Sequence, residues 1–175
     1  MIDWRSEIQR MTEAKAQVRT ADVESLWRCE TPRPPASPER VEEVARRLGH
    51  RIDPEYASFL LQADGWPALM QDVDLFGTSE LLGSPMTMAR ELVKTLEPDE
   101  LAGSRLDPES LLPIALSTTT VDFFVMPVPQ TNDPAPVIWI AGAEVERYSS
   151  FGEFFRAMIQ ENLSEADDLR SQQDG

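Results

Sequence analysis

Histidine and cysteine, on which many catalytic and metal sites depend, are nearly absent from this sequence of 175 residues. The chain has one cysteine, Cys29, and one histidine, His50. One cysteine excludes an internal disulfide and a zinc site built from several cysteines. One histidine has no partner to orient it as a base, so we expect His50 to face solvent at a helix end and Cys29 to be an idle thiol. No nucleophile-elbow, zinc-protease or phosphate-loop motif occurs, and the sequence therefore favours no catalytic residue and no cofactor.

Long apolar stretches are missing as well. No apolar run approaches the roughly 20 residues that a helix needs to cross a bilayer. The opening residues, MIDWRSEIQRM, are charged and lack the continuous apolar segment of a signal peptide. The apolar fraction of 41% is ordinary for a globular protein. We therefore expect a cytoplasmic protein that does not contact membranes, and the sequence leaves its oligomeric state open.

Positive charge is missing from two long parts of the chain. The net charge is −15, and no Lys or Arg occurs between Arg51 and Arg90 or between Arg105 and Arg147. Residues 52–175 hold 6 basic and 22 acidic residues, a net charge of −16. This distribution disfavours binding to nucleic acid or anionic membranes and favours a basic protein partner. The alternative is that the acids only keep the protein soluble.

Proline divides the chain near its first fifth. Residues 3–28 are predicted to be helical, with apolar side chains on a rough stripe. The segment ETPRPPASP that follows contains four prolines, which lack an amide donor and disfavour helix in the preceding residue. We expect an N-terminal helix and proline-rich linker over residues 1–36, a main domain over residues 37–165 and a polar tail over residues 166–175.

Two helices near the start of the main domain carry local start and stop signals. Ser37 suits the N-cap, Pro38 suits the first helical position, and Gly49 suits the end of the helix. Asp53 and Pro54 repeat the start signal in PEYASFLLQADGW, where apolar residues recur at helical spacing. These signals predict a pair of helices joined by a short turn.

Two more helices are predicted further along the chain. A helix over residues 84–98 is bounded by Ser84 and Pro98. The last helix begins at a capping box formed by Ser150 and Glu153, and an apolar stripe follows. That stripe must pack against a sheet or another helix.

The strand signals lie between these helices. Five segments rich in aliphatic and aromatic residues are bounded by turn formers: 73–76, 111–116, 121–126, 137–141 and 143–148. Pro113 predicts that its strand lies at an edge or begins late. The order of elements predicts an α+β fold, with a mostly antiparallel sheet of four to six strands flanked by helices.

Five quoted segments, in this serial order, resemble the SUKH superfamily. SPERVEEVARRLGHRIDPEYASFLLQADGW resembles its opening pair of helices, and VDLFGTSEL resembles its first strand. LLPIALSTTTVDFFVM is similar to its middle hairpin. PAPVIWIAGAEVERYSSFGEFFRAMI resembles its last hairpin and helix. The resemblance covers about residues 37–165, and residues 1–36 have no counterpart in it.

The resemblance implies a binding domain and not an enzyme. Bacterial members of the superfamily are commonly immunity proteins that neutralise toxin domains, often nucleases. Fungal members regulate cell-wall assembly through protein contacts. The sequence is therefore interpreted as an immunity protein that occludes a cognate toxin domain, with a regulatory or scaffolding module as the alternative.

Paired acids are the first candidates for contact with a partner. Asp72 and Asp74 are two residues apart, as are Glu144 and Glu146, so on a strand each pair shares a face. Asp122 lies in the second stretch without cations. Such carboxylates could meet Lys or Arg of a partner, hold Mg²⁺ or Ca²⁺, or face solvent.

An aromatic residue is the second candidate. Trp66 directly follows the Asp64-Gly65 helix stop. It either folds back to cap the core, or stands at the mouth of a cleft among Asp64, Asp72 and Asp74, where an arginine of a partner could stack on it. Trp139, in an apolar strand, is expected in the core.

Overall fold

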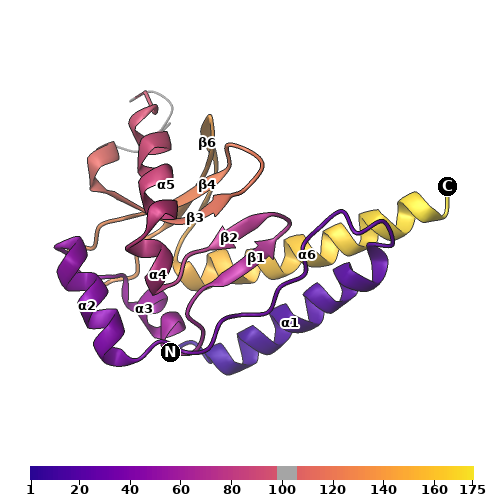
Figure 1. Cartoon of the computed structure of the whole chain (residues 1–175), viewed down its shortest axis with the longest axis horizontal. Coiled ribbons are helices and arrows are strands. Elements are labelled where there is room, and N and C mark those ends of the chain that lie inside the picture. Colours follow the sequence, from indigo (N-terminus) through magenta and orange to yellow (C-terminus); the bar gives the residue numbers. More distant parts are fainter. Residues whose placement is uncertain (98–105) are drawn as a thin grey trace.

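The computed structural model describes residues 1–97 and 106–175 and confirms the expected α+β class (Figure 1). Six strands form one antiparallel sheet in the order β1-β2-β3-β4-β5-β6. The strands are β1 (Trp66–Met70), β2 (Val73–Leu75), β3 (Leu111–Ser117), β4 (Phe123–Pro127), β5 (Val137–Ala141) and β6 (Ala143–Tyr148). The helices found in the described part are α1 (Trp4–Ala21), α2 (Pro38–Leu48), α3 (Pro54–Leu60), α4 (Thr78–Leu81), α5 (Ser84–Lys94) and α6 (Phe151–Gln173), with a 3₁₀ turn η2 (Pro108–Ser110).

The predicted capping signals start α2 and α3. The Ser37 hydroxyl accepts from the backbone N–H of Arg40 at 3.1 Å, and Gly49 ends α2 with a φ of 78°. The Asp53 carboxylate accepts from two backbone N–H groups at the start of α3 and from the N–H of Ala135 at 2.8 Å. Burial of Asp53 raises its pKa, because the charged form loses water. Asp53 therefore also ties α3 to the approach to β5.

The segment between β2 and β3 differs from the prediction. The helix expected over residues 84–98 is α5, which ends at Lys94, and Pro98 lies outside the described residues. The short helix α4 precedes it and was not expected. Pro113 lies in an interior strand, because β3 pairs with both β2 and β4. β2 pairs only with residues 115–117, and a bulge follows Pro113, so the missing proline N–H interrupts little of the ladder.

Strand β1 was not predicted, since the sequence signals placed the first strand at residue 73. Pro67 interrupts the usual strand composition, and both Ala68 and Gln71 have a φ of 50°. The β1–β2 register shifts between Trp66 and Met70. A strand with this irregularity has no clean alternation in its sequence.

Helix α6 begins as predicted but runs further. Ser150 accepts from the N–H of Glu153 at 3.3 Å, and the apolar stripe that follows is buried. The helix then continues to Gln173, so most of the expected polar tail is helical. Ala166 and Leu169 are buried against the end of α1, which explains why the last turns are helical.

The N-terminal arm is part of the core and not an appendage. Helix α1 ends at Ala21, earlier than the predicted residue 28, and it runs beside α6, with which it projects from the sheet (Figure 1). Trp4 is buried, and its ring lies 5.3–5.6 Å from those of Phe59, Phe151 and Phe155. Aromatic pairs at such distances add to the stability that area burial gives.

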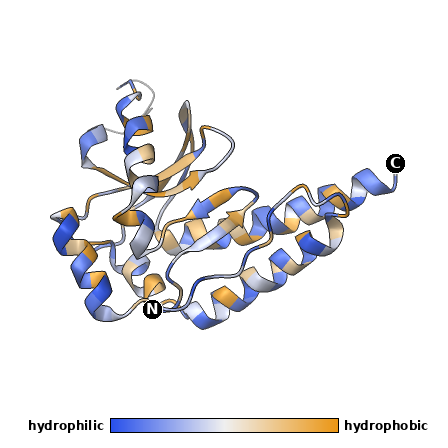
Figure 2. Ribbon diagram, viewed as in Figure 1, coloured by the Kyte–Doolittle hydropathy of each residue, from blue (hydrophilic) through white to orange (hydrophobic). Residues whose placement is uncertain are grey.

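The two faces of the sheet are covered by different helices. Phe124 contacts Phe154 of α6 at 5.2 Å between ring centroids. The neighbouring residues Phe123 and Val125 point to the opposite face, and α5 packs on β3. Figure 2 shows apolar residues along the strands, and hydrophilic residues over most of α2 and the last turns of α6. The core therefore lies between the sheet and α1, α3 and α6, with a second layer under α5.

Candidate functional site

The Trp66 side chain lies in the core and not on the surface. It is 0% exposed, its ring centroid lies 6.2 Å from that of Phe155, and its Nε1 donates to the carbonyl of Glu30 at 3.0 Å. The proline-rich linker thus covers the indole from outside. Of the two interpretations, the buried one agrees with this position, and Trp66 cannot touch a partner while the linker stays in place.

Asp64 has an internal role. Its carboxylate accepts from the backbone N–H of Thr78 at 2.6 Å and from the Thr78 hydroxyl at 2.7 Å. The chain approaches itself here, because a Cβ added at Gly77 would lie 2.1 Å from the carbonyl oxygen of Asp64. Asp64 therefore joins the end of α3 to the start of α4.

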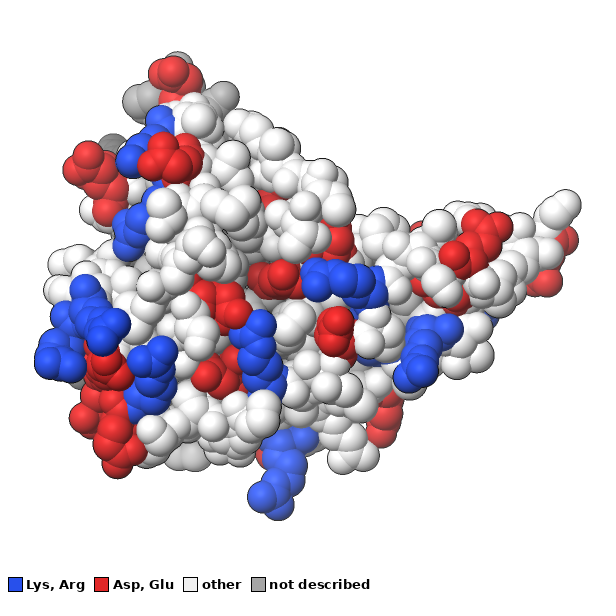
Figure 3. Space-filling model, in the orientation of Figure 1, with Lys and Arg blue, Asp and Glu red and all other residues white. Residues whose placement is uncertain are grey.

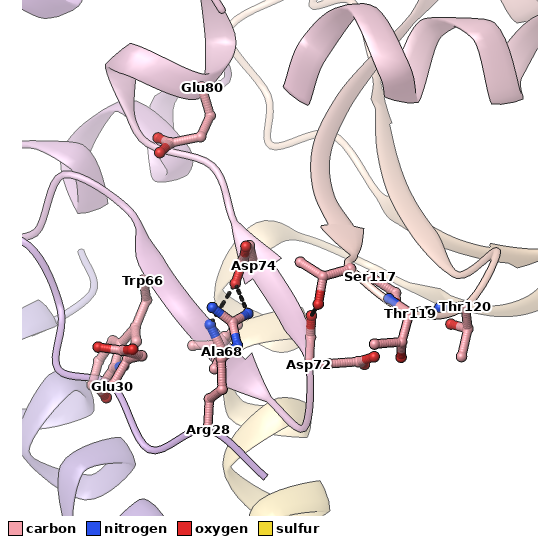
Figure 4. Close-up of polar contacts among 12 residues, drawn as sticks. Arg28, Glu30, Trp66, Ala68, Asp72, Asp74, Glu80, Ser117, Thr119 and Thr120 are labelled. Atoms are coloured by element: carbon pink, nitrogen blue, oxygen red, sulfur yellow. Dashed lines mark hydrogen bonds and ion pairs between the residues drawn. The ribbon is translucent and has the colours of Figure 1, made fainter. Parts of the chain in front are cut away.

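Asp74 is neutralised within the chain (Figure 4). Its Oδ1 accepts from Arg28 Nη2 at 2.6 Å and from the backbone N–H of Ala68 at 2.8 Å. The first contact fixes the linker to the sheet, and the second fixes the irregular backbone of β1. Asp72 lies in the β1–β2 turn and not on a strand, so the rule that placed it on one face with Asp74 does not apply.

A bulge separates Glu144 from Glu146. In the β5–β6 register Trp139 pairs with Glu146 and Ile140 pairs with Glu144, so Val145 is the extra residue. Glu144 forms a two-bond ion pair with Arg147 at 2.8 and 2.9 Å. Glu146 shares the face of Trp139 instead. The expectation that both glutamates share a face is therefore wrong, because a bulge reverses the alternation.

A hollow of about 200 Å³ gathers several of the remaining side chains. We call it the two-tryptophan hollow, since Trp27 and Trp139 stand in its wall. It lies between the linker, the β1–β2 turn, the β3–β4 turn and α6. Its other lining residues are Met70, Gln71, Asp72, Val73, Thr119, Thr120, Asp122 and Glu161. Asp72 and Asp122, which the sequence marked as candidates, are thus brought together.

Hydrogen bonds hold both indoles of the hollow in place. Trp139 Nε1 donates to Asp122 Oδ1 at 2.8 Å, and its ring stacks on Phe124 with centroids 5.5 Å apart. Trp27 Nε1 donates to Glu165 Oε1 at 2.8 Å, and Gln71 Nε2 donates to the other oxygen of Glu165 at 2.9 Å. Trp139 is partly exposed, so the expectation that it lies in the core holds only for one side of its ring.

Asp72 carries an uncompensated charge. Its Oδ2 atom is buried and has no hydrogen-bond partner within the described residues. Figure 4 shows its carboxylate turned towards Thr119 and Thr120 and away from Asp74 and Arg28. A buried carboxylate oxygen without a donor is costly in a folded protein.

The electrostatic field beside the hollow is negative. Burial raises the pKa of Tyr148, and the nearby carboxylates of Glu146 and Glu161 raise it further, because both disfavour the phenolate. No Lys or Arg stands among the residues that line the hollow. Elsewhere charges alternate: basic and acidic side chains mix over α2 in Figure 3, where Glu43 pairs with Arg40 and Arg47. Figure 3 shows both acidic and basic atoms where the sheet meets the projecting helices.

A buried lysine anchors the arm that supplies Trp27. Lys15 is 5% exposed, and its ammonium donates to the carbonyls of Ala68, at close range, and Leu69, at 3.4 Å. Desolvation by burial lowers the pKa of Lys15 to about 8. The contact fixes α1 to the irregular part of β1, and so holds the linker over the sheet.

The residues suited to catalysis are dispersed in the part of the chain that the structure describes. The His50 ring contacts the carbonyl of its neighbour Arg51 at 2.8 Å, and Cys29 is exposed with its Sγ 4.0 Å from the carbonyl of Lys15. Among the described residues, no three His, Cys, Asp or Glu side chains are placed to hold a metal ion. The arrangement that the chain does present is an acidic, aromatic recess.

Trp27 and Glu161 were not among the sequence candidates. Trp27 stood within a segment predicted to be helical, and Glu161 stood on the polar side of α6. The signal available for Trp27 was Asp22, five residues earlier, whose carboxylate accepts from the N–H groups of Leu26 and Trp27 at 2.8 and 2.9 Å and ends α1 in a turn.

A family model matches most of the chain. The model of the SMI1 / KNR4 family (SUKH-1) matches residues 35–157. A search of curated proteins finds no match. No described helix is both long and apolar enough to cross a membrane. The matched region contains Asp72, Asp122 and Trp139, whereas Trp27 and Glu161 lie outside it.

Proposed function

The chain belongs to the SMI1 / KNR4 family (SUKH-1), and from this premise we propose that it is an immunity protein that binds and occludes a cognate bacterial toxin domain. The family membership supports a role in protein interaction. The observation that carries the finer proposal is the two-tryptophan hollow, where acids and indoles meet without a neutralising cation in the lining.

The charge of the chain supports a basic partner. A net charge of −15 attracts cationic proteins and accelerates their association, while aromatic anchors at an interface slow dissociation. A nuclease must bind phosphate, so its working surface is basic, and an acidic inhibitor competes with the nucleic acid for that surface. The proposed mechanism is therefore steering by charge followed by burial of a small aromatic contact.

The regulatory alternative has the same chemistry at its surface but a different partner. A scaffolding module would hold a host protein without blocking a toxic activity. Only the identity of the bound protein separates the two functions, so the experiment must begin from a toxin.

The test is rescue of growth. The full chain is co-expressed with the toxin domain encoded beside its gene, and the complex is purified. We expect rescue, a stable complex, and an association rate that falls several-fold between low and physiological salt. Capture of a host regulator without rescue would favour the scaffolding role, and a salt-independent association rate would contradict the steering mechanism.

A further inference from the structure

We propose that the two-tryptophan hollow receives a single arginine side chain from the protein partner. The inference rests on the proposed function for the identity of the partner, but not for the chemistry of the hollow.

The size of the hollow fits one side chain. Sites for drug-sized ligands occupy about 300–1,000 Å³. The hollow encloses about 200 Å³ and is open to solvent, so it cannot bury a larger molecule. An extended side chain that projects from a protein surface enters such a recess without any change in the backbone.

The charge of the hollow favours a cation. Asp72, Asp122 and Glu161 line it, and no lining residue is basic. The Oδ2 atom of Asp72 is buried without a donor, so the charge of this carboxylate is not compensated by the described residues. A cation seated in the hollow places its charge beside this carboxylate, in a site where water screens the attraction less than at the open surface.

The aromatic wall favours arginine over lysine. Both indole N–H groups are already bonded, to Asp122 and to Glu165, so the rings are held in place, and one side of the Trp139 ring is stacked on Phe124. A guanidinium stacks on an aromatic face and donates in a plane to carboxylates, whereas an ammonium is a strongly hydrated point charge. Rigid rings lose little conformational freedom when they bind.

The surroundings of the hollow suit a protein and not a free ion. Six large apolar side chains are exposed among the described residues, and two of them directly adjoin residues of the hollow in the chain: Leu26, beside Trp27, and Val121, beside Asp122, with 53% and 59% exposure. Exposed apolar residues near polar ones are typical of protein interfaces. The partner is therefore expected to present an arginine surrounded by apolar residues.

The hollow combines residues of the region that the family model matches with residues of the segments on either side of it. Asp72, Asp122 and Trp139 come from the matched region, while Trp27 and Glu161 come from the segments on either side of it. A family member that lacks these segments would lack one indole wall and one carboxylate. The arm therefore contributes to the choice of partner as well as to stability.

A small probe tests the hollow without the toxin. The full chain is titrated with N-acetyl-arginine amide while the indole N–H resonances are followed by NMR, with the buried Trp4 and Trp66 as internal references. We expect the Trp27 and Trp139 signals to shift with a dissociation constant on the order of 1 mM, as befits a ligand of this size. The neutral citrulline analogue should bind at least tenfold more weakly, and the lysine analogue more weakly than arginine.

Isosteric variants supply the controls. Asp72→Asn with Asp122→Asn removes two charges and keeps an acceptor for Trp139 Nε1, whereas Asp168→Asn removes a charge from an exposed position of α6 outside the hollow. The double variant should weaken binding of the probe at least tenfold, and the control less than twofold. Equal shifts with citrulline, equal binding by the double variant, or no shift at all would overturn the inference.

The two proposals fail separately. In a complex with the toxin domain, the double variant should raise the dissociation constant about 30-fold or more, and the control less than threefold. If the probe binds but the chain neutralises no toxin, the hollow is an arginine site and the immunity function is wrong. If the double variant neutralises the toxin as well as the native chain does, the immunity function stands and the hollow is not the anchor of the interface.

Discussion

Replacement of Lys15 by Met should change how the stability of the fold depends on pH. Burial lowers the pKa of Lys15 from 10.5 to about 8 in the folded protein. Between these two values the unfolded chain binds more protons than the folded one. The free energy of unfolding therefore rises with pH across this window, since the cost of burying the ammonium disappears as Lys15 loses its proton.

The size of the effect follows from the two pKa values. One pKa unit corresponds to about 1.4 kcal/mol, and integration from pH 8 to pH 10 gives a gain of about 2 kcal/mol in the free energy of unfolding. This is an upper limit, because the bonds from Lys15 to the carbonyls of Ala68 and Leu69 favour the charged form. Tyr56 and Tyr148 oppose this gain from about pH 9 upward, because their raised pKa values make stability fall as the tyrosines of the unfolded chain ionise.

The assay is urea unfolding followed by far-ultraviolet circular dichroism at pH 7, 8, 9 and 10. The native chain should gain stability from pH 8 to pH 10, and Lys15→Met should lose that gain. At pH 7 the variant loses a buried charge but leaves the carbonyl of Ala68 without its lysine donor, while that of Leu69 keeps Asn162 at 2.9 Å. These effects oppose each other, so the variant should still fold.

A matched control separates Lys15 from lysines in general. Lys94 is 71% exposed and pairs with Glu91 on the surface of α5, so Lys94→Met should leave the slope unchanged. The reasoning is refuted if the native chain shows no gain between pH 8 and pH 10, or if Lys15→Met keeps the gain. Both variants retain all other titratable groups, so the difference between their slopes reports Lys15 alone.

Four further substitutions test the packing and the charges, each by the midpoint of urea unfolding. Gly77→Ala should lower the free energy of unfolding by at least about 2 kcal/mol, since its Cβ would lie 2.1 Å from the carbonyl oxygen of Asp64; a smaller loss would show that the backbone yields. Asp74→Asn should cost up to about 1 kcal/mol, because it loses a partly exposed ion pair, whereas Asp72→Asn should cost nothing; the reverse order would contradict the assigned roles. Leu169→Ala should cost about 2 kcal/mol if the last turns of α6 are held by packing, and no change would mean that they are not.

The parts of the fold that the sequence predicted are those with local causes. Ser37 and Ser150 accept from the third residue that follows, and these capping contacts need only neighbouring residues. The apolar stripe of α6 likewise identifies its own buried face. Such features are encoded within one or two turns of chain.

The parts that the sequence did not predict depend on distant residues or on a single inserted one. Trp66 is covered by the linker, where the carbonyl of Glu30 accepts a hydrogen bond from the indole. Val145 reverses the faces of Glu144 and Glu146, and a bulge leaves no mark in a short strand. Of the candidate acids, only Asp72 and Asp122 line the hollow. Asp64 and Asp74 are engaged by Thr78 and Arg28, partners far away in the sequence that no local pattern reveals.

The mutual packing of α1 and the last turns of α6 limits how the protein can be shortened. The family match ends at residue 157, yet the segments outside it cover each other and the sheet: Lys15 reaches β1, and Ala21 packs beside Leu169. A protein shortened to residues 35–157 would expose Trp66 and Phe155 to water, because the linker and α1 that cover them would be missing. A shortened protein for expression or for fusion to a reporter should therefore keep both terminal segments, since removal of either one exposes the buried face of the other.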